Sequence, residues 1–342
     1  MVIHIPVKEY VIHNSNGMSA TFSNFGARLV ELTVPDRTGN YANVVLGFDT
    51  HDEYLINVGN YFGATIGRVA GRISKSLFAG NNLSFQLKPN EGENHLHGGI
   101  EKSLDRVLWS GQLSEISGSE AIKFSYKSKS GEEGYPDNLS VDLNCSLTNS
   151  NELIFEYSAT TTSDTPVNIT NHIYWNLKDS GASSILNHNL QINSEKIVKM
   201  DSNLLPTGGY VSCADSGMNF KELTAIANAL PKTPSEPWPG IDNTFMLSNK
   251  KTGELTEAAI LYDPASGRKM TITTTEPSLQ VYSANRLGNL MGRHGIIYGQ
   301  GNSICIETQR VIDNQALPEL QSIVLKAGQL YQHKTIYKFS TQ

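Results

Sequence analysis

Leu139-Ser140-Val141-Asp142-Leu143-Asn144-Cys145-Ser146-Leu147 is the stretch of sequence that decides the fold. Apolar and polar residues alternate strictly in it, which predicts a β-strand with one buried and one wet face. The polar triplet Asn149-Ser150-Asn151 then predicts a turn. Apolar residues return at positions 153, 155, 157 and 159, so we expect an antiparallel hairpin near the middle of the chain.

The same alternation recurs in segments 122–126, 270–274, 279–282, 303–307 and 335–339. A helical pattern is predicted only at residues 219–230, where Phe220, Leu223, Ala227 and Leu230 recur, and a further short element is expected at residues 52–58. Many short strands with very little helix predict an all-β fold, namely a large antiparallel β-sandwich. No composition break or fixed-period repeat divides residues 1–342, so we expect a single domain.

Charge and composition argue against several classes of protein. The net charge is -6 and the basic residues are scattered, which gives no pattern for a nucleic-acid partner. Neither a membrane-length apolar run nor a signal-peptide core is present, so we expect a cytoplasmic monomer or homodimer with no membrane partner. The three cysteines, Cys145, Cys213 and Cys305, are too widely spaced for a disulfide framework or a CxxC zinc site. Cys145 and Cys305 lie in apolar alternations and are expected to be small buried residues.

Two histidine segments carry candidate chemistry, because imidazole exchanges protons near neutral pH. In Asn94-His95-Leu96-His97-Gly98-Gly99 the two histidines share a face if the segment is extended. In Asn171-His172-Ile173-Tyr174-Trp175-Asn176 a strand would place His172, Tyr174 and Asn176 together, a combination that suits a sugar. Each segment could instead be a turn or core strand with a satisfied histidine. Five other histidines, at positions 13, 51, 188, 294 and 333, are predicted to be surface residues.

Three charged residues are further candidates. Glu307, in Ile304-Cys305-Ile306-Glu307-Thr308-Gln309, is either exposed or buried with partners, and burial would make it a better base near pH 7. Asp242 could be a ligand-binding residue or only part of a turn. Arg72 offers a planar donor fork for hydroxyls or a carboxylate. Spacing alone does not decide among these readings.

A metal site is the rival interpretation. The spacing His95-x-His97-x3-Glu101 resembles the first metal motif of cupins, and His172-x3-Asn176 is similar to their second. The framing glycines and proline of those motifs are missing, so we expect no metal and a solvated Glu101.

Segments along almost the whole chain resemble the aldose 1-epimerase (galactose mutarotase) family. They include Asn24-Phe25-Gly26-Ala27-Arg28, Val45-Leu46-Gly47-Phe48, Gly63-Ala64-Thr65-Ile66-Gly67-Arg68, both histidine segments, Gly240-Ile241-Asp242, Pro277-Ser278-Leu279-Gln280-Val281-Tyr282, Ile306-Glu307-Thr308-Gln309, Leu325-Lys326-Ala327-Gly328 and Thr335-Ile336-Tyr337. The resemblance implies a galactose mutarotase-like supersandwich. It also implies an isomerase that interconverts the anomers of a free aldose such as galactose or glucose without a cofactor.

The same resemblance implies roles for particular residues. Glu307 would be the general base, His172 the general acid, and His97 would polarise the ring oxygen of the sugar. Substrate contacts would come from Arg72, Asp242, Gln280 and Tyr174. A hexose-6-phosphate 1-epimerase and a non-catalytic sugar-binding protein on the same scaffold remain alternatives.

Departures from the family pattern leave the sugar open. Gly71 stands where the family usually has Asn, Ser103-Leu104-Asp105 replaces a Gly-Phe-Asp, and residues 310–315 form an unusual loop.

Overall fold

The computed structural model describes residues 6–230, 240–248, 253–312 and 322–342. Strands dominate this part of the chain, and its single α-helix is α1 (His51–Ile56), which confirms the element expected at residues 52–58. Thr50 and Glu53 begin this helix with a reciprocal capping box. No helix among the described residues has the length and apolar character needed to cross a membrane.

The larger layer is a nine-stranded antiparallel sheet with the order β10-β11-β12-β13-β29-β23-β22-β17-β20. Its strands are β10 (Ser110–Ile116), β11 (Ser119–Ser128), β12 (Leu139–Leu147), β13 (Glu152–Thr161), β29 (Tyr331–Thr341), β23 (Arg268–Thr274), β22 (Thr256–Tyr262), β17 (Asn189–Ile192) and β20 (Thr224–Ala225). Strands β12 and β13 form the predicted hairpin with Leu143 opposite Tyr157. Asn151, in the turn, takes a left-handed φ of 60°, which asparagine tolerates better than most residues.

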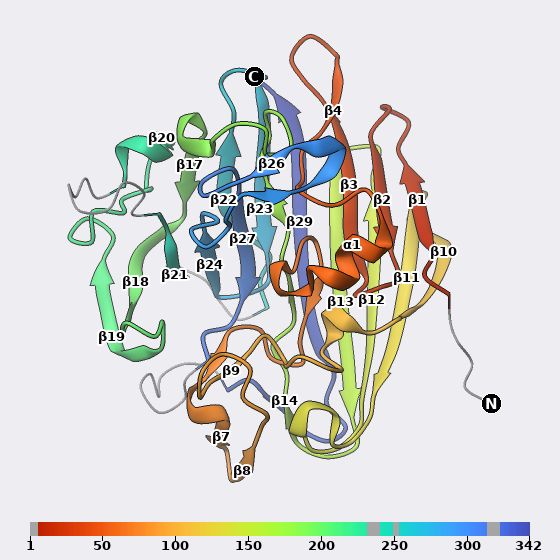
Figure 1. The fold of residues 1–342 in the computed structure, drawn as a ribbon, viewed down its shortest axis with the longest axis vertical. Helices are drawn as coiled ribbons and strands as arrows, with labels where there is room; N and C mark the ends of the chain where they lie inside the picture. The colour runs from red at the N-terminus through yellow and green to blue at the C-terminus, as the bar shows by residue number, and fades with distance from the viewer. Residues whose placement is uncertain (1–5, 231–239, 249–252, 313–321) are drawn as a thin grey trace.

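Two further sheets cover the nine-stranded sheet (Figure 1). One is β1 (Glu9–His13), β2 (Ser19–Ser23), β3 (Arg28–Pro35) and β4 (Tyr41–Asn43). The other has the order β16 (Tyr174–Trp175), β27 (Ile304–Gln309), β24 (Ser278–Tyr282), β21 (Asp242–Leu247), β18 (Ser194–Met200) and β19 (Pro206–Ser212).

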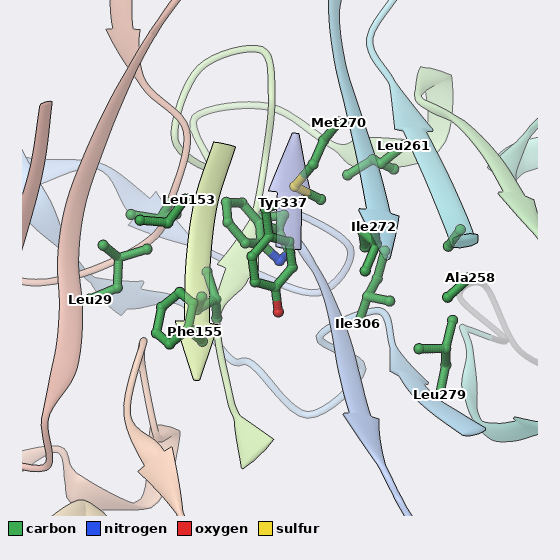
Figure 2. Packing of buried hydrophobic residues seen from close by; sticks show 14 of the residues in the cluster. Leu29, Leu153, Phe155, Ala258, Leu261, Met270, Ile272, Leu279, Ile306 and Tyr337 are labelled. Carbon is green, nitrogen blue, oxygen red and sulfur yellow. The ribbon is translucent and has the colours of Figure 1, made fainter. Parts of the chain in front are cut away.

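The core lies between these layers. Figure 2 shows Leu29 of β3 beside Phe155 of β13, and Ile306 of β27 near Ile272 of β23. Tyr337 of β29 lies between these two groups (Figure 2). The side chains come from alternate positions of each strand, as the sequence pattern requires. The predicted all-β sandwich is therefore confirmed.

Short pairs and single 3₁₀ turns connect the sheets. The pairs are β5 (Thr65–Ile66) with β15 (Thr170–Asn171), β6 (Arg72–Ile73) with β9 (His95–Leu96), β7 (Leu77–Gly80) with β8 (Leu83–Gln86), β14 (Thr165–Pro166) with β28 (Val324–Leu325), and β25 (Leu290–Met291) with β26 (Ile297–Tyr298). The 3₁₀ turns are Val58–Asn60, Ser74–Ser76, Leu104–Arg106, Glu132–Gly134, Ile185–Asn187, Ile226–Asn228 and Arg293–Gly295.

The helix predicted at residues 219–230 is wrong. Thr224 and Ala225 form β20, which pairs with Leu190 and Asn189 at the edge of the large sheet, and only Ile226–Asn228 makes a 3₁₀ turn. Backbone pairing with β17 outweighs the local helical spacing of the apolar residues.

Two histidines predicted to lie on the surface are buried. The His188 imidazole accepts a hydrogen bond from the backbone N–H of Leu177, and Nδ1 of His333 lies 2.9 Å from the carbonyl oxygen of Ile169. Both imidazoles satisfy backbone groups in the interior, a role that single-residue context does not reveal.

Candidate active site

One face of the six-stranded sheet carries acidic and amide side chains. Gln280 of β24 lies directly opposite Glu307 of β27 and, on its other side, opposite Thr244 of β21. Because side chains alternate along a strand, Asp242 shares this face with Thr244, while Ile306 points into the core. The sheet register thus brings together residues that are far apart in sequence.

His172 reaches the same face from a short bridge between two strand pairs. Its N–H donates to the carbonyl of Ala64, and its own carbonyl accepts from Gly63. Tyr174, two residues later, pairs with Cys305 of β27. The imidazole stacks against the Tyr174 ring, with centroids 5.0 Å apart and an interplanar angle of 25°. Backbone and ring contacts therefore fix His172 beside β27.

Arg72 and His97 enter together because β6 pairs with β9, with Arg72 opposite Leu96. The N–H of His97 donates to the carbonyl of Gly71, and the N–H of Gly71 donates back to Nδ1 of His97 at 3.2 Å. Gly98 permits this turn, since a Cβ there would lie 1.9 Å from the carbonyl oxygen of Gly67. Only glycine allows this close approach of two backbone segments.

These segments enclose a cavity of about 230 Å³. All seven residues predicted for the site line it, namely Arg72, His97, His172, Tyr174, Asp242, Gln280 and Glu307. The walls also include aromatic side chains, a composition typical of small-molecule sites.

His172 and Glu307 form the centre of the cavity. Nε2 of His172 lies 3.7 Å from Oε1 of Glu307, and both side chains are almost fully buried. Burial, together with the Asp242 charge, raises the pKa of Glu307 well above its ordinary value, although Arg72 opposes the shift. Burial lowers the pKa of His172 to about 4. Both groups therefore disfavour their charged forms, and the pair can hold one exchangeable proton.

Oε2 of Glu307 has no hydrogen-bond partner among the described residues. A buried carboxylate oxygen left in this state is costly. It is free to accept a hydrogen bond from a ligand hydroxyl in the cavity.

His97 has a defined protonation pattern. Because Nδ1 accepts from Gly71, the neutral imidazole carries its proton on Nε2. Burial, His172 and Arg72 lower the pKa of His97 well below its ordinary value, so the ring stays neutral. His97 can therefore donate one hydrogen bond without carrying charge.

The polar wall is internally hydrogen-bonded. Glu91 holds Arg72 with two bonds, of 2.6 and 2.7 Å, and accepts a third from Arg286 at 3.3 Å. Thr244 donates to Oε1 of Gln280 at 2.5 Å, and Nε2 of Gln280 donates to Asp242 at 2.7 Å. Such charge-assisted and chained bonds fix the positions of groups that face the cavity.

Sequence reasoning missed Gln309, Tyr61 and Glu91. Gln309 lies two residues beyond Glu307 on the same strand face, lines the cavity, and has an Oε1 atom with no partner in the described structure. The period-two pattern could have revealed it. Tyr61 stacks on His172 with centroids 5.6 Å apart, and Glu91 acts through Arg72. No sequence pattern pointed to either residue.

The cupin-like motifs do not assemble. His95 contacts the Lys88 carbonyl and the Tyr135 hydroxyl, and Glu101 pairs with Lys88 at the surface. Asn176 was expected to lie beside His172 and Tyr174. Its amide instead donates hydrogen bonds to two backbone carbonyls, and it does not line the cavity. A different set, His97, His172 and Glu307, offers ligand atoms that lie within 4.8 Å of one another and could hold a divalent ion.

The departures from the family pattern fall partly at the site. Gly71 has a φ of 89°, and a Cβ there would lie 2.8 Å from Cδ1 of Ile312, which occupies that side of the cavity. Asp105 is buried beside Arg106. Of the loop at residues 310–315, positions 313–315 lie outside the described residues.

Comparison with known proteins agrees with the fold. The family model described as "Aldose 1-epimerase" matches residues 8–338. Galactose mutarotase from Bos taurus is 35% identical over 327 residues, which cover 95% of this chain and 92% of that protein. Aldose 1-epimerase from Escherichia coli (strain K12) is 30% identical over 337 residues, covering 98% and 95%.

A crystal structure of an aldose epimerase homologue from C. elegans superposes with a TM-score of 0.88 at 28% identity, covering 98% of this chain and 99% of that one. The chain therefore belongs to the aldose 1-epimerase family, as its segments predicted.

Proposed function

We propose that the chain is an aldose 1-epimerase that interconverts the α and β anomers of a free aldose such as galactose or glucose. The observation that carries this proposal is the buried pair of His172 Nε2 and Glu307 Oε1, 3.7 Å apart, in a cavity lined by hydroxyl-binding side chains. Anomer exchange needs one proton removed and one supplied at neighbouring oxygens of a sugar ring, which is the work such a pair performs.

The proposed mechanism uses only side chains of this chain. The Glu307 carboxylate takes the proton from the anomeric hydroxyl, and that O–H electron pair forms the C1=O bond. The C1–O5 bond breaks, and O5 takes the proton from Nε2 of the His172 imidazolium. His97 donates a hydrogen bond to O5 from its neutral Nε2. Rotation about C1–C2 and reversal of both transfers give the other anomer, so protons and charge balance.

Arg72, Asp242 and Gln280 would hold the remaining hydroxyls, and the flat ring of Tyr174 would pack against the C–H face of the sugar. No cofactor or metal enters this scheme.

The charge of the cavity favours a free sugar over a hexose 6-phosphate. Its two arginines, Arg72 and Arg286, already share Glu91, and they face Asp242 and Glu307. The Arg68 guanidinium donates hydrogen bonds to backbone carbonyls, and Arg310 pairs with buried Glu276. Among the described lining residues, a phosphate would therefore meet two arginines that are already paired with Glu91.

The test is mutarotation followed by polarimetry, starting from pure α-galactose and α-glucose. Glu307→Ala and His172→Ala should each lower the enzymatic rate by about a hundredfold or more, the scale of lost general acid–base catalysis. His294→Ala is the control, because this side chain is 80% exposed.

A sugar-binding protein without catalytic activity would bind aldoses but leave the buffer rate unchanged. A panel of galactose, glucose, xylose, arabinose and a hexose 6-phosphate defines the substrate. Loss of activity in EDTA, with recovery on adding zinc, would contradict the metal-free mechanism.

A further inference from the structure

Cys305 touches His172, the proposed acid of the site. Its sulfur lies 3.4 Å from Nδ1 of His172, while the other ring nitrogen, Nε2, faces Glu307. Cys305 and Glu307 are two residues apart on β27, so the same strand face contacts both nitrogens of one imidazole. The thiol is fully buried, and it was expected from the sequence only to fill space.

The two ring nitrogens must play different roles in the proposed reaction. A histidine that gives a proton from Nε2 and later takes one back there must keep its second proton on Nδ1 throughout. The pair holds one exchangeable proton, located either on Nε2 facing a carboxylate or on Glu307 facing a bare Nε2. In both arrangements Nδ1 carries hydrogen, and the Cys305 sulfur lies within hydrogen-bond distance of it.

We propose that Cys305 is a positioning residue for His172, whose sulfur accepts the Nδ1–H hydrogen bond and so keeps Nε2 as the nitrogen that exchanges the proton. This inference rests on the proposed function. Burial and the Glu307 charge raise the pKa of the thiol well above its ordinary value, so it meets the imidazole as a neutral group. A neutral sulfur is a weak acceptor, and it orients the ring without stabilising the imidazolium as a carboxylate would. His172 consequently remains a strong acid.

The experiment compares Cys305→Ala, which removes the acceptor, with Cys305→Ser, which restores a small acceptor. We expect Cys305→Ala to lower kcat about five- to tenfold with KM within twofold, the effect of one lost neutral hydrogen bond. Cys305→Ser should stay within threefold of wild type. Cys145→Ala is the matched control, because it truncates another fully buried cysteine, on β12 of the large sheet, and should leave kcat unchanged.

Nuclear magnetic resonance of ¹⁵N-labelled protein gives a readout independent of activity. The His172 signals are assigned by their disappearance in His172→Gln. In the wild type and in Cys305→Ser, Nδ1 should appear protonated and Nε2 unprotonated whenever the ring is neutral, and Cys305→Ala should show a mixture of tautomers. An Nε2-protonated wild type overturns the proposal, as does an equal loss of kcat in the Ala and Ser variants or in Cys145→Ala. If the wild type showed no mutarotation, the proposed function would be wrong. The tautomer measurement would still test the contact between Cys305 and His172.

Discussion

Replacing Glu307 by Gln should remove most of the activity and at the same time stabilise the folded protein. Gln preserves the size and shape of the side chain but cannot serve as the base. Glu307 is 2% exposed, and its Oε2 atom has no partner among the described residues. The folded protein therefore disfavours the ionised carboxylate, which is why the pKa is raised. The substitution removes that penalty.

The size of the effect follows from the buried negative charge, which Gln does not carry. A pKa unit corresponds to about 1.4 kcal/mol, so a buried carboxylate whose pKa is raised carries a penalty of about 1–3 kcal/mol. The entropy of unfolding is about 2.1 cal/mol/K per residue, or roughly 0.7 kcal/mol/K for 342 residues, so Tm should rise by about 1.5–4 °C at pH 7. Since the folded-state pKa lies above the unfolded value near 4.5, the penalty is absent below that pH and grows as pH rises. The gain in Tm should therefore disappear at pH 4.

Differential scanning calorimetry at pH 7 and pH 4 measures both effects, alongside polarimetry for activity. Glu276→Gln is the control, because Glu276 is equally buried but lies 3.4 Å from Arg310. Breaking that pair should lower stability by up to about 3 kcal/mol, the opposite sign. A lower Tm for Glu307→Gln at pH 7, or an equal gain at pH 4, would refute the reasoning.

Two further predictions concern the groups around the base. The alkaline limb of the kcat/KM profile reports loss of the last proton from the His172–Glu307 pair. Asp242 raises the pKa of Glu307 and Arg72 lowers it, so Asp242→Asn should move this limb to lower pH and Arg72→Gln to higher pH. Shifts of both variants in the same direction would contradict the assigned charges. Glu91→Gln should raise KM about tenfold with kcat nearly unchanged, because Arg72 loses the carboxylate that fixes it. If steady-state kinetics showed a lower kcat and an unchanged KM, Glu91 would have another role.

Most of the fold could be predicted because its strands alternate cleanly. The central hairpin of β12 and β13 appears where the pattern of residues 139–159 placed it. The prediction failed at residues 219–230, where apolar spacing suited a helix but two residues, Thr224 and Ala225, pair with β17. A contact between distant segments decides such a short edge strand, and local sequence does not contain that information.

The candidate site also contains residues that the sequence predicted and residues that it did not. All seven predicted residues line one cavity, since the family segments that carry them are specific in order and spacing. Glu91 was missed because it acts through two arginines, Arg72 and Arg286, that are remote from it in sequence. His188 and His333 were misplaced at the surface because their partners are backbone groups remote in sequence. Touching the cavity does not guarantee a signature in the sequence either, because Tyr61 lines it and no pattern pointed to it.

The alternation that builds the core also builds the site. On β27, Ile304, Ile306 and Thr308 face the nine-stranded sheet, and the intervening Cys305, Glu307 and Gln309 face the cavity side. A slip of one residue in the pairing with β24 would send Glu307 into the core and Ile306 to the sugar. Burying an unpaired carboxylate there costs more than a marginally stable protein tolerates. The hydrophobic pattern that selects the register therefore also orients Glu307, Cys305 and Gln309 towards the cavity side of the sheet.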